Sequence, residues 1–151
     1  MFSATQLANF LACPHITTLE RAEGAGEIRK PFFDDPGVDL LRALGLKHEQ
    51  AYLNHLRDDQ GLDVILIPQD LSWSRAAART LQEMKRGAAA IYQATLIEPE
   101  RHGRGGRADF LIRVDKPGAF GFWSYEVVET KLARSTRATI RANSMASPTW
   151  R

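Results

Sequence analysis

Residues 123–132 read WSYEVVETKL, and this stretch decides the fold. Its aromatic and β-branched side chains predict a buried strand rather than a surface helix. Because side chains alternate along a strand, Glu129 and Lys131 are expected on one face and Thr130 on the other. A Glu-x-Lys pattern by itself usually marks a solvated face. At the end of a buried strand, however, charges are costly without partners or a metal, which favours a functional site.

A second carboxylate lies at the end of residues 106–109, GRAD. Asp109 precedes an apolar run that predicts another strand, and pairing of the two strands would bring Asp109, Glu129 and Lys131 together. Two carboxylates suit Mg²⁺ or Mn²⁺, and such a cation polarises a phosphate and lowers the pKa of a bound water. Lys131 would then position that water or offset negative charge on the phosphate. The alternative is that Asp109 caps a turn.

The composition bounds the class of protein. With 151 residues, of which 44% are hydrophobic and 25% charged, the chain is expected to form one soluble domain. No apolar run reaches membrane-spanning length, and the first residues lack the pattern of a signal peptide. The single cysteine, Cys13, excludes an internal disulfide framework and indicates a reducing cytoplasm. A net charge of +2 is compatible with a nucleic-acid partner but does not require one.

The periodicity of apolar residues predicts helices early in the chain and strands later. Helices are expected near residues 3–11 and at 15–23, 39–57 and 74–86, and strands at 64–67, 89–97, 107–114 and 121–130. The fold class is therefore α/β, with N-terminal helices packed on a three-strand antiparallel meander. The domain is expected to span residues 1–139, and the aperiodic residues 140–151 to form a disordered tail.

Several basic or titratable side chains outside the strands are weaker candidates. His48 shares an apolar stripe with Leu41, Leu44 and Tyr52, so it is expected to point inward, as a core residue or as a third metal ligand. Its neighbour Glu49 is expected to face solvent. Four arginines are weak candidates for contact with a phosphate backbone, and a flexible loop or a solvated helical face is the favoured explanation: Arg104, Arg107, Arg134 and Arg137.

Taken together, five segments of the chain resemble the RecB-like nucleases of the PD-(D/E)XK superfamily. The likeness is to a bacterial subfamily that is often joined to a superfamily 1 helicase. The segments are FSATQL through CPH at residues 2–15, GLKHE at 45–49, IYQA at 91–94, GRADFL at 106–111 and YEVVETKLA at 125–133. They cover the chain from its start to about residue 138, and the ordered set is far more specific than any one member.

This resemblance implies a restriction-endonuclease-like core that cleaves DNA with Mg²⁺ or Mn²⁺. It makes Asp109 and Glu129 metal ligands, Lys131 the catalytic lysine and His48 a metal-site histidine, with single- or double-stranded DNA and a superfamily 1 helicase as partners. Members of the family continue into a helix with a Gln-x-x-x-Tyr motif and a further strand. Neither follows Lys131 here, so we expect an incomplete domain.

The resemblance also bears on other cofactors and on activity. Some relatives bind an iron–sulfur cluster through four cysteines, but Cys13 is the only cysteine here, so no such cluster is expected. The missing core elements leave two alternatives to an active nuclease. One is an inactive remnant that binds nucleic acid or a protein, and the other is a structural domain whose charged strand end pairs internally.

Overall fold

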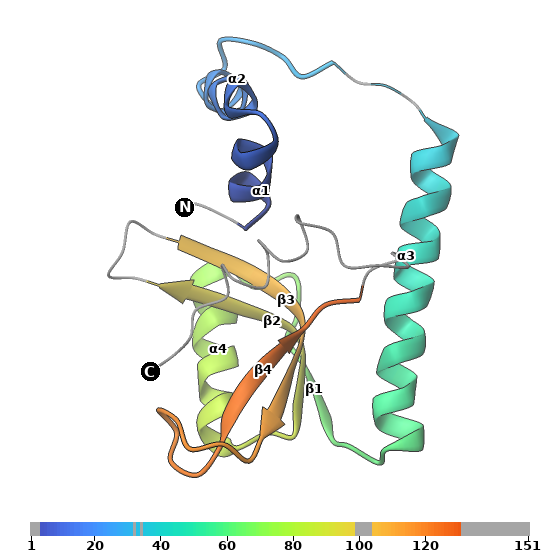
Figure 1. The fold of residues 1–151 in the computed structure, drawn as a ribbon, viewed down its shortest axis with the longest axis vertical. Coiled ribbons are helices and arrows are strands. Elements are labelled where there is room, and N and C mark those ends of the chain that lie inside the picture. Colours follow the sequence, from blue (N-terminus) through green and yellow to red (C-terminus); the bar gives the residue numbers. More distant parts are fainter. Residues whose placement is uncertain (1–3, 32, 34, 99–103, 131–151) are drawn as a thin grey trace.

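The computed structural model describes residues 4–31, 33, 35–98 and 104–130, and it is an α/β fold (Figure 1). The helices are α1 (Ala4–Ala12), α2 (Pro14–Gly24), α3 (Pro36–Asn54), which runs into a π-helical turn at His55–Asp59, and α4 (Trp73–Arg86). The strands are β1 (Val64–Leu66), β2 (Ala90–Glu98), β3 (Arg104–Val114) and β4 (Ser124–Val128). In the part of the chain that is described, no helix has the length and apolar character needed to cross a membrane.

The strands form one mixed sheet in the order β1-β2-β3-β4. The predicted antiparallel meander is confirmed as β2, β3 and β4, with Leu111 opposite both Ile91 and Val127. The strand predicted at residues 64–67 is confirmed as β1, but its place in the sheet, parallel to β2 as a fourth strand, was not predicted. A three-residue strand has too few side chains for its pattern to show whether it pairs in the sheet. The tail predicted at residues 140–151 lies outside the described residues.

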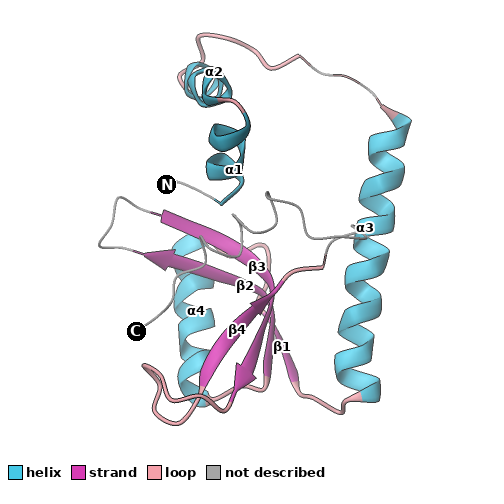
Figure 2. Ribbon diagram, in the orientation of Figure 1, coloured by secondary structure: helices cyan, strands magenta, loops and turns pink. Residues whose placement is uncertain are grey.

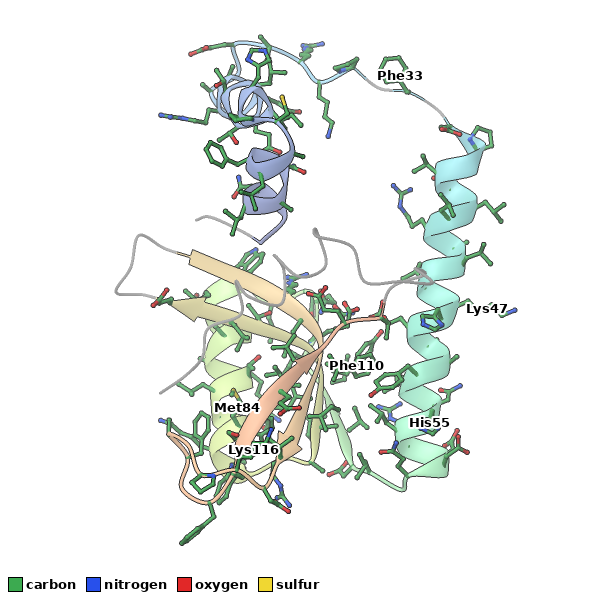
Figure 3. The ribbon with its side chains drawn as sticks, viewed as in Figure 1. Phe33, Lys47, His55, Met84, Phe110 and Lys116 are labelled. Atoms are coloured by element: carbon green, nitrogen blue, oxygen red, sulfur yellow. The ribbon has the colours of Figure 1, made fainter. Side chains whose placement is uncertain are left out.

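Helix α4 covers one face of the sheet (Figure 2). Its apolar residues, including Met84 (Figure 3), pack against side chains from β2 and β3 in the α4-side core. This core consists of Ile67, Ala76, Met84, Ile91, Ala94, Leu96, Ala108 and Leu111. Gly87 ends the helix in the left-handed conformation that glycine adopts without steric cost, with φ 77°.

Helix α4 also protects the edge of β2 beyond the point where β1 ends. Thr80, which is fully buried, donates its hydroxyl to the Ala76 carbonyl at 2.9 Å and accepts the Thr95 backbone N–H at 3.0 Å. A backbone N–H in such a position would otherwise be buried without a partner. The Thr80 hydroxyl therefore accepts the hydrogen bond that a neighbouring strand would otherwise accept from the Thr95 N–H.

The opposite face of the sheet is covered by the C-terminal end of α3 and the π-helical turn. Phe110 lies between the sheet and this helix (Figure 3), with its ring 4.9 Å from the rings of both Tyr52 and Tyr92. The α3-side core consists of Leu53, Leu56, Val64, Ala90 and Phe110. The prediction that the N-terminal helices as a group cover the sheet was therefore too broad.

The first two helices pack chiefly against each other, beyond one end of the sheet (Figure 1). Asn9 of α1 donates to Glu20 of α2 at 2.7 Å, and Ala8 is buried. Several large apolar side chains of these helices stay exposed, among them Phe10 and Leu11. Their predicted helical state is confirmed, but the sheet is covered by α4 and the end of α3.

Candidate functional site

An open pocket of about 410 Å³ lies where α3 passes the middle of β3 and the residues just after β4. Its lining combines two carboxylates, one guanidinium and apolar groups of α3. The residues that line it are Leu41, Arg42, Gly45, Leu46, Glu49, Asp109 and Thr130. Polar groups that converge in a partly apolar pocket are what a binding or catalytic site requires.

Asp109 is fixed in this pocket by Thr130. Its Oδ2 atom accepts hydrogen bonds from the Thr130 backbone N–H at 2.7 Å and from the Thr130 hydroxyl at 2.9 Å. The last β3–β4 pair is Phe110 with Val128, so Asp109 and Glu129 occupy the next position of the same register. The predicted pairing of the two segments is therefore confirmed. It is Thr130, expected on the face opposite Glu129, that contacts Asp109.

The side chains of β2 and β3 switch faces at this position. Residues three apart in a regular strand point to opposite faces, yet Ile91 and Ala94 both belong to the α4-side core. Ala108 and Leu111, also three apart, do the same on β3. Gln93 and Asp109 lie between these pairs, where the ladder is interrupted. Both strands bend near the middle of their length (Figure 2).

The switch directs Gln93 and Asp109 toward α3. Tyr92 and Phe110 already point that way because they stack on each other on the α3 side. Gln93 also reaches that side, since its amide donates to the Glu49 carboxylate. Two consecutive residues of each strand thus face α3, and one of each pair is polar. The local backbone, rather than the alternation of the strand, brings these polar groups to the pocket.

On α3 the residue that faces the sheet is Glu49. Lys47 points away from the sheet (Figure 3), and Glu49 lies about 200° further around the helix. Glu49 is half-buried and lines the pocket, whereas His48 is exposed. The expectation that His48 points inward and Glu49 outward was therefore wrong. The side of the helix that faces the sheet includes Gly45, Glu49 and Leu56. It is therefore rotated about the helix axis from the stripe predicted through His48.

Burial and the negative charges of the pocket affect the pKa of the neighbouring Tyr92 hydroxyl. Burial raises the pKa of Tyr92, and so do its hydrogen bond with Glu49 and the charges of Glu49 and Asp109, whereas Gln93 lowers it. The two carboxylates thus act on the same hydroxyl. Arg42, on the same helix as Glu49, supplies positive charge to the lining and pairs with Asp39 at 2.7 Å.

The basic residues predicted from the sequence do not appear among the described residues that line this pocket. Arg107 is exposed, with its guanidinium carbon 5.0 Å from the centre of the Trp73 ring and a hydrogen bond to Gln69. The backbone of Arg104 belongs to β3. Lys131, Arg134 and Arg137 lie outside the described residues. Glu129 is half-buried and is not among the described residues that line the pocket.

Glu49 and Asp109 give the pocket two hard oxygen ligands of the kind that Mg²⁺ and Mn²⁺ prefer. Within the described ranges no group of three or more His, Cys, Asp or Glu side chains is arranged to hold a metal ion. Sequence reasoning missed Glu49, Arg42 and Gln93. The available signal was the spacing of Glu49 from Gly45 and Leu56, four residues before it and seven after it.

Comparison with known proteins found no match to this chain among protein-family models, curated proteins or solved structures.

Proposed function

We propose that the chain is a divalent-metal-dependent nuclease that hydrolyses DNA phosphodiesters in the pocket between α3, the middle of β3 and the end of β4. The observation that carries the proposal is the convergence of Glu49, Asp109 and Arg42 on one open pocket. A Mg²⁺ or Mn²⁺ ion bound there would polarise the phosphate and lower the pKa of a bound water. Arg42 would contact the phosphate from α3, about two turns before Glu49, where its positive charge favours binding.

The two carboxylates are oriented for this role by their neighbours. Both described hydrogen bonds to Asp109 reach Oδ2, from the backbone and hydroxyl of Thr130, so Oδ1 is the oxygen for a cation. Gln93 donates to Oε1 of Glu49. Outer partners of this kind fix the direction of metal-binding carboxylates.

The rest of the proposed site comes from the resemblance to RecB-like nucleases. Glu129 is the residue next in register opposite Asp109, and we propose it as a further ligand. Lys131 is proposed as the catalytic lysine, and His48 stays a weaker candidate because it is exposed. A restriction-endonuclease-like core is compatible with the observed mixed sheet. A helicase partner and a cytoplasmic location complete the proposal.

The test is cleavage of labelled single-stranded and duplex DNA with Mn²⁺, with Mg²⁺ or with a chelator. We expect cleavage only with metal, and a loss of at least about 100-fold in Asp109→Asn and in Lys131→Ala. Asp115→Asn is the matched control, because Asp115 is an exposed aspartate in the turn after β3. Cleavage that survives chelation, or equal rates in all four proteins, would remove the basis of the proposal.

A second candidate function is a DNA-binding module without activity. The observation that favours it is that Asp109 accepts two hydrogen bonds from Thr130 just after β4, which gives its carboxylate a structural role that needs no metal. Salt-sensitive DNA binding without metal-dependent cleavage would select this candidate.

A further inference from the structure

Gln93 has an uncommon backbone conformation. Its φ is 58°, and among the described residues no other side-chain-bearing residue has a positive φ. Left-handed residues other than glycine are uncommon, and they are rarer still inside a strand. Such strain persists where the surroundings impose it, and it clusters at functional sites.

The conformation determines where the Gln93 side chain goes. Regular alternation from Ile91 would place the Gln93 amide among the apolar side chains of the α4-side core. The left-handed backbone sends it to the other face, where its Nε2 donates to Oε1 of Glu49. A buried amide without a partner is thereby avoided, and a carboxylate of α3 gains a fixed donor.

We propose that Gln93 is the positioning residue of the pocket: its left-handed backbone and its amide together hold the Glu49 carboxylate toward Asp109. This inference rests on the proposed function, because it assigns Glu49 the role of a cation ligand. The amide is suited to the task because it is neutral. A neutral donor bound at Oε1 fixes the direction of Oε2 without placing a positive charge where a cation would bind.

The first part of the test measures the coupling between the two side chains. Thermal unfolding of Q93G, E49A and the double variant forms a double-mutant cycle. Glycine tolerates the left-handed backbone, so Q93G removes the amide without imposing strain. We expect the drop in Tm caused by Q93G to disappear when Glu49 is already alanine. Additive drops in Tm would overturn the inference.

The second part measures cation binding, which a purely structural hydrogen bond would not change. Calorimetry with Mn²⁺ should show an affinity about 10- to 100-fold weaker in Q93G than in the wild type. Q50A is the matched control, since Gln50 is an exposed glutamine of the same helix that bonds to Asn54, and its affinity should be unchanged. If Q93G does not fold, Q93N serves, because asparagine also tolerates this backbone.

The outcomes separate this inference from the proposed function. Wild-type protein that binds Mn²⁺, with Q93G binding equally well, overturns the role of Gln93 and leaves the nuclease proposal standing. Wild-type protein that binds no Mn²⁺ overturns both. Weaker binding in Q93G together with a non-additive cycle supports both.

Discussion

Two substitutions of Asp109 are expected to differ in their effect on the free energy of unfolding while both abolish metal-dependent cleavage. Asp109→Ala removes both hydrogen bonds that Thr130 makes to the carboxylate, whereas Asp109→Asn keeps an oxygen at nearly the same place. Hydrogen bonds to charged groups contribute about 1.5–3 kcal/mol each, and neutral ones about 0.5–1.5 kcal/mol. Because Asp109 is only half-buried, we take the lower end of each range.

On this basis Asp109→Ala should lower the free energy of unfolding by about 3 kcal/mol and Asp109→Asn by about 1–2 kcal/mol. Both variants should lose metal-dependent cleavage, because neither presents a charged oxygen to the cation. Urea unfolding followed by tryptophan fluorescence gives the first quantity, and cleavage of labelled DNA gives the second. As a control, Thr130→Val removes only the hydroxyl bond and should cost about 1.5 kcal/mol.

Two results would refute this reasoning. Equal stabilities of the alanine and asparagine variants would mean that the bonds to Thr130 do not hold the strand end. Full cleavage by Asp109→Asn would mean that the negative charge of Asp109 is not needed for the reaction.

Three further predictions concern stability. Thr80→Val should cost about 1–3 kcal/mol in urea unfolding because it leaves the buried Thr95 N–H unpaired, while Thr80→Ser should retain most of the stability. Phe110→Ala should cost about 3–5 kcal/mol, measured the same way, since Phe110 is fully buried between two tyrosine rings; a cost below 1 kcal/mol would contradict the packing described. Burial raises the pKa of Tyr125 to about 12, with Glu83 adding to the effect and Arg113 opposing it, so its contribution is complete below about pH 10 and is lost as the pH rises toward 12. Tyr125→Phe should remove that part of the pH dependence, and an unchanged slope of stability against pH would contradict the assignment.

The strands and their pairing could be predicted because their residues carry a strong local signal. The aromatic and β-branched residues around Val127 predict a strand, and the turn before it predicts an antiparallel partner. No comparable signal marks the parallel addition of β1. Parallel neighbours are set by a crossover helix, here α4, and by packing over long separations.

The candidate site was predicted only in part, for two physical reasons. A helical stripe can be drawn through His48 or through Glu49 with the same period, and only tertiary contact selects between faces about 100° apart. The position of Asp109 was predicted correctly beside the end of β4, but its partner Thr130 was not. Alternation cannot reveal the switch of faces in β2, which occurs at the left-handed residue Gln93, since glutamine carries no signature of that conformation.

The shared switch also means that the facing positions of Gln93 and Asp109, where the ladder is interrupted, are not needed for the alternation of apolar side chains in β2 and β3. If both residues were deleted together, Ile91 and Ala94 would become next-but-one neighbours, as would Ala108 and Leu111, and the ordinary zigzag would deliver the same apolar groups to α4. Deleting only one of the two residues would shift the register between β2 and β3 by one residue on one side of the deletion. These two positions thus place polar side chains at the pocket on the α3 side instead of adding to the α4-side core.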